Sequence, residues 1–386
     1  MSQGAPAVAD PSALPEPDRV EGAPHPRETA QLFGQSAAEA RFLDAYKSGR
    51  LHHAWLITGP RGTGKATLAW RLARFLLATP APGADAGPLG ATPPPPTSLD
   101  VDPEHPVARR MRALSEPGLF LLRRGPNDKG DRVSADIRVD EVRKLKGFFA
   151  LSAADDGRRV VILDAADEMN TAAANAVLKL LEEPPAGAVL LLVSHQPNRL
   201  LPTIRSRCRE LRLAPLGADD LAAALAAAGE APAPETAAAL ADLAGGSVGE
   251  ALRLLHLDGL AIYRDIVATF NPAPRYDRTR AIALANSAAG AANAARFELI
   301  LRLIELFLAR LARTGAGLPP AREAVPNEAA LLARLAPDLH ASRRWAGLQQ
   351  TLSARAEHGR AVNLDPAALI LDMVFRINDA ANDRTA

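Results

Sequence analysis

The chain has 386 residues, of which 48% are hydrophobic and 23% charged, a composition typical of a globular protein with two or three domains. Its formal net charge of +1 excludes a global field of either sign, so any nucleic-acid contact would need a local basic patch. The single cysteine, Cys208, excludes an internal disulfide and a multi-cysteine zinc site, and it suits a reducing cytoplasm.

The first 25 residues are rich in alanine and proline with scattered acids, and we expect residues 1–25 to be a disordered tail. They have no apolar core behind a basic head, so they do not resemble a secretory signal. The most apolar helical run, residues 297–311, is too short and too charged to span a bilayer. We therefore expect a cytoplasmic protein with no membrane partner.

A phosphate-binding pattern follows the first predicted helix and strand. The run "LFGQSAAEARFLDAYKSGRL" has helical spacing, "HAWLITG" is a short apolar strand, and "KATLAWRLARFLLA" is a second helix. Between the strand and that helix, "GPRGTGKAT" at residues 59–67 fits G-x-x-x-x-G-K-[ST], except that Ala66 replaces the hydroxyl residue. That hydroxyl normally ligates the Mg²⁺ that accompanies ATP, so this loop is a working site, a damaged one or one kept for another purpose.

Further strands and helices alternate along the next part of the chain. Residues 79–106 form a proline-rich insertion, in which the prolines at 93–96 forbid helix or central strand. A helix is expected from Ile137, a strand at "VVIL" ending at Asp164, and a helix over "NTAAANAVLKLLEEPP". The run "AVLLLVS" is a third strand, and "RLLPTIRSRCRELRL" leads into a fourth. Apolar strands alternating with helices predict a parallel sheet that is covered on both faces.

The remainder of the sequence reads as helical. We expect an α/β P-loop domain at residues 26–214, a small helical domain at 215–272 and a third, all-helical domain at 273–386. The last helix has a clear start signal, with Asp365 as N-cap and Pro366 at the first helical position. An apolar stripe in the third domain could pack in its core or against partner helices; it consists of Phe297, Ile300, Ile304, Phe307 and Leu311.

Three side chains near these elements have candidate roles. In a P-loop fold, backbone amides of the loop hold phosphates and Lys65 supplies a positive charge. Asp164, at the end of a strand, has the position of a magnesium-side carboxylate. We interpret Cys208 as a packing residue, because nothing in the sequence suggests a base that would activate it.

Four stretches occur in an order typical of one family: "GPRGTGKATLAWRLARFLL", "VVILDAADEMNTAAANAVLKLLEEPP", "LLLVSHQPNRLLPTIRSRC" and "GGSVGEALRLL". Together they resemble the clamp-loader AAA+ proteins of bacterial DNA polymerase III, most closely the delta-prime family, over about residues 26–257. The run "LLEEPP" followed by "SRC" is the most specific feature. The resemblance implies a RecA-like AAA+ domain, a helical lid and a helical collar for oligomerisation.

The resemblance also implies roles for individual residues. Asp164 would be the magnesium-side acid, Ser194 the sensor of the terminal phosphate, and Arg207 an arginine finger directed at ATP in a neighbouring subunit. The implied nucleotide-binding set is Gly59, Pro60, Arg61, Gly62, Thr63, Gly64, Lys65, Ala66, Thr67, Asp164 and Ser194.

The chain departs from the ATP-hydrolysing members of this family at three positions. Ala66 lacks the hydroxyl, Ala165 replaces the glutamate that polarises water, and Gly249 replaces an arginine that touches the nucleotide. These departures imply a stator with absent or weak ATPase activity of its own, which binds ATP and Mg²⁺ weakly if at all. Many family members carry a four-cysteine zinc module where this chain has its insertion at 79–106, so we expect no zinc.

The implied function is that of a subunit that helps to load the β sliding clamp onto primed-template DNA during DNA replication. The implied partners are the tau/gamma and delta subunits in a hetero-pentameric ring, within a DNA-directed DNA polymerase holoenzyme whose polymerisation lies in other chains. One alternative is an ATP-hydrolysing tau/gamma-type motor subunit, against which Ala165 and Gly249 argue. A small-molecule P-loop kinase is a second alternative, but it would leave "SRC" unexplained.

Overall fold

The computed structural model describes residues 16–19, 23–79, 95–127, 129–150, 157–273 and 275–382. The chain divides into two compact units, one of residues 1–228 with 247–249 and the other of residues 229–246 with 250–386. The three-domain boundaries expected from the sequence stay a prediction. Most of the expected disordered tail, residues 1–15 and 20–22, lies outside the described residues, as do residues 80–94 of the proline-rich insertion.

The first unit is built around a five-stranded sheet with the strand order β2-β3-β4-β1-β5. All neighbouring strands run parallel, which confirms the expected α/β class with a parallel sheet. The strands are β1 (Ala54–Thr58), β2 (Leu119–Leu122), β3 (Arg159–Asp164), β4 (Ala188–Ser194) and β5 (Arg209–Arg212). Because parallel strands end at the same edge, the carboxyl ends of β1, β3 and β4 bring Thr58, Asp164 and Ser194 together there.

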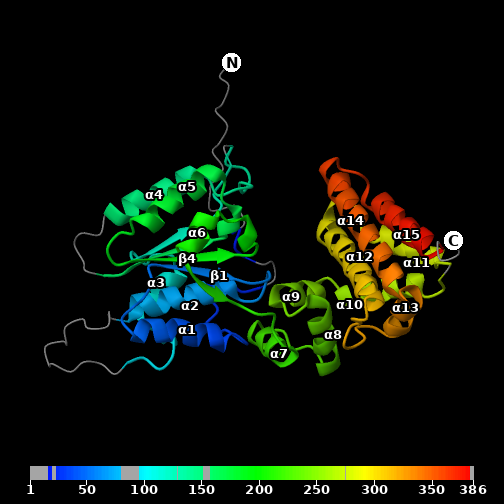
Figure 1. Cartoon of the computed structure of the whole chain (residues 1–386), viewed down its shortest axis with the longest axis horizontal. Helices are drawn as coiled ribbons and strands as arrows, with labels where there is room; N and C mark the ends of the chain where they lie inside the picture. The colour runs from blue at the N-terminus through cyan, green and yellow to red at the C-terminus, as the bar shows by residue number, and fades with distance from the viewer. Residues whose placement is uncertain are drawn as a thin grey trace, which may run out of the picture. The chain divides into compact units, whose positions relative to one another are not determined.

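Helices cover both faces of this sheet, as the apolar strands predicted (Figure 1). Alternate residues of β1 face opposite ways: Trp55 packs with α1 and α2, and Leu56 packs with α4 and α5. The helices of this unit are α1 (Ser36–Lys47), α2 (Lys65–Ala78), α3 (Pro106–Arg112), α4 (Val139–Ala150), α5 (Thr171–Glu182), α6 (Pro202–Ser206) and α7 (Ala218–Ala227).

The second unit consists of helices in the part of the chain that the structure describes. They are α8 (Pro234–Ala244), α9 (Val248–His256, whose first two residues belong to the first unit), α10 (Gly259–Phe270), α11 (Arg278–Asn286), α12 (Ala294–Gly315), α13 (Glu328–Leu335), α14 (Leu339–Ala361) and α15 (Pro366–Asn382). Short 3-10 turns stand at Ala166–Glu168, Pro197–Arg199 and Ala291–Asn293.

Two expectations about this second unit are resolved. Asp365 accepts a hydrogen bond from the Ala368 amide at 2.9 Å, which confirms the predicted N-cap of α15. The apolar stripe of α12 is buried inside the unit itself, so it forms core. Within the described ranges, every helix is either too short or too polar to cross a membrane.

Candidate functional site

The loop between β1 and α2 has the backbone that its glycines allow. Gly62 and Gly64 have φ values of +75° and +90°, in the left-handed region that favours glycine. A side chain at Gly59 would place its Cβ 2.6 Å from the Leu213 carbonyl oxygen, which excludes any larger residue there. Steric constraints on these glycines therefore explain the predicted pattern. The loop that they shape leads directly into the first turn of α2.

Lys65 begins α2 and is almost fully buried, with 2% of its surface exposed. Its Nζ donates a hydrogen bond to the Pro60 carbonyl oxygen of the loop at 2.5 Å. Burial lowers the pKa of Lys65 to about 8, although the charges of Asp164 and Asp167 partly oppose that shift. The loop thus holds a buried ammonium group with further N–H donors for an anion.

Asp164 ends β3 and is 8% exposed. Burial raises its pKa to about 7, the charges of Asp18 and Glu168 raise it further, and Lys65 opposes the change. The carboxyl is therefore close to half protonated at neutral pH. Because Mg²⁺ binds the ionised form, this acid is a poor magnesium ligand until an incoming cation displaces its proton.

Two unpartnered polar atoms lie beside these charges. Ser194 is fully buried, and its Oγ has no hydrogen-bond partner among the residues that the structure describes. The Nδ1 atom of the next residue, His195, is likewise buried without a partner. Burial lowers the pKa of His195 to about 4, helped by the positive charges of Lys65 and Arg61, so its ring is neutral at neutral pH.

The arrangement fits a phosphate group better than it fits a metal ion. A buried lysine, an unpartnered serine hydroxyl and the loop amides all offer donors to an anion. On the metal side, Ala66 offers no ligand atom, and the described ranges contain no group of three or more histidine, cysteine or acidic side chains that could hold a metal. The residues present therefore suit a nucleotide whose Mg²⁺ has few protein ligands.

The start of α9 lies against the glycine loop within the same unit. The Val248 amide donates to the Gly62 carbonyl at 3.0 Å. A Cβ on Gly62 would come within 2.0 Å of the Ser247 Oγ, so glycine permits this close approach. Gly249 also reaches the loop, but with backbone only, and it supplies no charge to a phosphate there.

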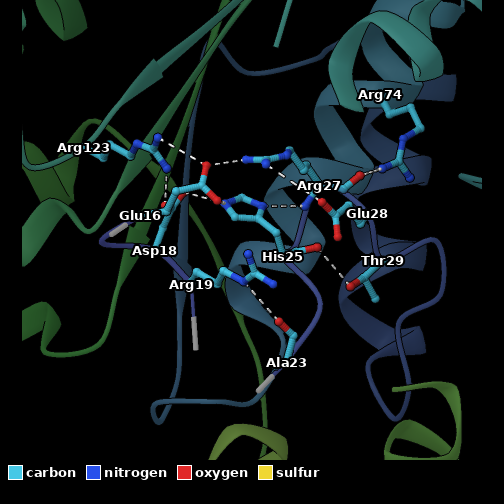
Figure 2. Close-up of polar contacts among 10 residues, drawn as sticks. All are labelled: Glu16, Asp18, Arg19, Ala23, His25, Arg27, Glu28, Thr29, Arg74 and Arg123. Atoms are coloured by element: carbon cyan, nitrogen blue, oxygen red, sulfur yellow. Dashed lines mark hydrogen bonds and ion pairs between the residues drawn. The ribbon is translucent and has the colours of Figure 1, made fainter. Parts of the chain in front are cut away.

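An N-terminal segment, residues 16–19 and 23–29, adds charges to this edge of the sheet (Figure 2). The fully buried His25 lies 3.3 Å from Asp18, and its ring meets the Trp70 ring of α2 edge-on. Burial would raise the pKa of Asp18, but His25 and Arg123 outweigh it and hold that pKa below its usual range.

This segment includes part of the tail, residues 1–25, that was expected to be disordered. Its described residues make specific contacts with the rest of the unit instead. Asp18 pairs with Arg123, and Glu16 pairs with Arg27 at 2.5 Å, so charge complementarity replaces the missing apolar residues. Arg123 is 105 positions from Asp18 in the sequence, so no local sequence pattern predicts their contact. Sequence reasoning therefore missed Asp18 as a neighbour of the Asp164 carboxyl.

Arg207 lies at the opposite edge of the sheet from the glycine loop. It follows α6 and stands two residues before Arg209, which pairs with Trp55 near the amino end of β1. Three further residues of β1, at about 3.3 Å each, separate that position from the carboxyl edge. Arg207 is therefore well removed from the loop of its own chain, and its side chain remains 38% exposed.

Cys208, next to Arg207, behaves as a packing residue. It lies against the core on the α4 and α5 side of the sheet. Burial raises the pKa of its thiol to about 12, so it carries no thiolate at neutral pH. The interpretation of Cys208 as a packing residue agrees with this environment.

Comparisons with known proteins match the first unit. Residues 34–217 match the family model described as "DNA polymerase III, delta subunit". The DNA polymerase III subunit delta' of Pseudomonas aeruginosa is 44% identical over 156 residues, which are 40% of this chain and 41% of that protein. The subunit delta' of Escherichia coli K12 is 34% identical over 178 residues, 45% of this chain and 46% of that protein. The matches thus span less than half the length of these two relatives.

Two further similarities are to gamma-type proteins, one from sequence and one from a solved structure. The DNA polymerase III subunit gamma/tau of Mycobacterium tuberculosis H37Rv is 33% identical over 189 residues, 47% of this chain and 28% of that protein. A solved gamma subunit-related protein of Thermotoga maritima has 16% identity and a TM-score of 0.41, covering 88% of this chain and 99% of its own. Residues 34–217 are therefore similar to the DNA polymerase III delta-subunit family, and delta' subunits are among the relatives that the chain resembles.

Proposed function

We propose that this chain is a delta-prime subunit of a bacterial clamp loader. In this role it joins tau/gamma and delta subunits in a hetero-pentameric ring, and the ring loads the β sliding clamp onto primed-template DNA during replication. The observation that carries the proposal is the exposed Arg207 at the sheet edge opposite the chain's own loop. A guanidinium there can reach ATP only in a neighbouring subunit, where it stabilises charge on the transferred phosphoryl group.

The chain's own loop binds nucleotide weakly and does not turn it over. Loop amides and Lys65 hold the phosphates, Ser194 offers its free hydroxyl, and Asp164 is the carboxylate available to Mg²⁺. Ala165 is a buried apolar residue where an attacking water would need a carboxylate. Bound ATP with its Mg²⁺ would therefore stabilise the first unit without being hydrolysed.

One alternative rests on a specific similarity. The identity to gamma/tau subunits favours an ATP-hydrolysing motor subunit of the same machine. The side chains at 66, 165 and 249 disfavour it, because none of them can ligate Mg²⁺, orient water or contact a phosphate with a charge.

The test is the ATPase rate of the reconstituted loader with clamp and primed DNA. We expect Arg207→Ala to lower turnover strongly, since an arginine finger contributes about 10³–10⁵ in kcat at the site that it serves. Lys65→Ala should change turnover little. The matched control is Arg205→Ala, which removes an exposed arginine two residues before Arg207, on α6. A strong loss from Lys65→Ala, together with ATP hydrolysis by the isolated chain, would establish the motor subunit instead.

A further inference from the structure

The guanidinium of Arg207 is held from two sides by its own chain. Its Nη2 atom lies 2.9 Å from the Glu182 Oε1 atom, and its Nη1 donates to the Thr203 carbonyl oxygen at 3.1 Å. Glu182 is the last residue of α5, and Thr203 belongs to α6, which packs against α5. Two separate helices therefore fix the position of one exposed side chain.

The stability of the fold does not explain this pair. Glu182 is 44% exposed, and an ion pair at such a surface position contributes only about 0–1 kcal/mol. Its position is also unfavourable in itself, because the carboxyl end of a helix carries partial negative charge and disfavours an acid. Glu182 at the end of α5 thus contributes little to the stability of the fold, but its carboxylate is well placed to hold Arg207.

The held guanidinium keeps N–H groups for another ligand. Arginine has five N–H donors, and the contacts with Glu182 and Thr203 use two of them. The remaining donors can bond an incoming phosphate while both anchors stay in place. This geometry favours a side chain that is preorganised for its ligand, since its rotamer is fixed before the neighbouring ATP arrives.

We propose that Glu182 is a positioning residue, which orients the Arg207 guanidinium toward ATP of the neighbouring subunit. The inference rests on the proposed function, in which Arg207 is the finger. It also links the two most specific sequence features, because Glu182 belongs to "LLEEPP" and Arg207 belongs to "SRC". The end of α5 is itself anchored, since the Leu181 carbonyl oxygen lies 3.1 Å from the His53 Nε2 atom.

The chain offers a matched control beside the test residue. Glu183 is also an exposed glutamate at the end of α5, and its substitution removes the same charge from the same place. We would measure ATP turnover of the reconstituted loader with Glu182→Ala, Glu182→Gln and Glu183→Ala. Each would be made in the parent chain, and Glu182→Ala also in the Arg207→Ala background, with ring assembly checked by size-exclusion chromatography.

The expected result has three parts. Glu182→Ala lowers kcat about tenfold or more at the site that Arg207 serves, with the KM for ATP unchanged, so turnover of the ring approaches the Arg207→Ala level. Glu182→Gln gives an intermediate loss, because its amide oxygen still accepts a hydrogen bond, and Glu183→Ala matches the parent chain. In the Arg207→Ala background, Glu182→Ala causes no further loss.

Other outcomes overturn the inference. Equal effects of Glu182→Ala and Glu183→Ala, a rise in turnover, or a further loss in the Arg207→Ala background would each exclude a positioning role. If Arg207→Ala itself leaves turnover unchanged, the proposed finger fails as well. The two failures are therefore distinguishable.

Discussion

At the scale of single residues, the site is dominated by two opposite charges buried beside each other. The pKa of Asp164 is raised to about 7 and that of Lys65 is lowered to about 8, so burial moves both toward neutrality. Taking a charge pair out of water has a cost that its mutual attraction only partly offsets. The loop therefore keeps these groups at some expense of stability, which agrees with the phosphate-binding role proposed for it.

This cost predicts a dependence of stability on pH. A carboxyl whose pKa rises on folding binds more protons when folded, so its contribution to stability falls as pH rises from about 4 to 7 and is then constant. Asp164→Asn removes the ionisable group. We expect the variant to exceed the parent protein in its free energy of unfolding at pH 7–8, with the difference shrinking toward pH 4, as measured by urea titration.

Asp140→Asn is the control for that experiment. Its carboxylate forms an exposed ion pair with Arg143 at 2.7 Å, with 71% of the Asp140 side chain in solvent. It should change stability by no more than about 1 kcal/mol across the same pH range. A difference between Asp164→Asn and the parent that does not vary with pH, or that grows toward pH 4, would contradict the expected burial cost.

At the scale of elements, the long strands with continuous apolar runs were predictable, and the short edge strand β2 was not. Strands β1, β3 and β4 are fully or largely buried, and their sequences accordingly contain continuous runs of hydrophobic residues. Strand β2 was missed, because its four residues are mostly half-buried at the edge of the sheet, where no long apolar run is needed.

The candidate site likewise has features that could be predicted from the sequence and features that could not. The glycines at 59, 62 and 64 were predictable because local backbone geometry requires them. The contacts of Asp18 with Arg123 and of Arg207 with Glu182 were not, because they join elements far apart in sequence. Spatial neighbours of this kind depend on the order of the strands and on helix packing, which no local pattern specifies.

The helical unit contains one buried ionic network that joins three helices. Glu328 of α13 accepts hydrogen bonds from the Tyr263 hydroxyl of α10 at 2.6 Å and from Arg310 of α12 at 2.7 Å. The Glu328 and Arg310 side chains are only 1% and 6% exposed. We expect Glu328→Ala to lower the free energy of unfolding by about 3–5 kcal/mol, because it leaves the Arg310 charge buried without its partner.

A second glutamate–arginine pair in the same unit is the comparison for this effect. Glu298 and Arg360 lie 2.8 Å apart with about half of each side chain exposed. Glu298→Ala should cost no more than about 1 kcal/mol in the same urea titration. Similar losses in the free energy of unfolding for Glu328→Ala and Glu298→Ala would mean that solvent screens both pairs alike. The buried network would then contribute no more to stability than a surface ion pair.

At the scale of the whole molecule, each of the two units has a hydrophobic core of its own. Phe42 is fully buried among α1, α2 and the sheet in the first unit, and Phe307 is fully buried in the second. A unit with its own core can unfold by itself. The glycine loop, Asp164 and Arg207 all belong to the first unit, so a nucleotide bound at the loop, as proposed, would stabilise that unit directly.

Calorimetry of the full chain tests whether the units unfold separately. We expect two transitions, with Phe42→Ala lowering one and Glu328→Ala lowering the other. A loss of about 3–5 kcal/mol in a unit of this size corresponds to a shift of about 6–20 °C in its Tm. Addition of Mg²⁺-ATP should raise only the transition that Phe42→Ala lowers, because the loop belongs to that unit. A single transition that shifts in both variants would show instead that the two cores unfold as one cooperative body.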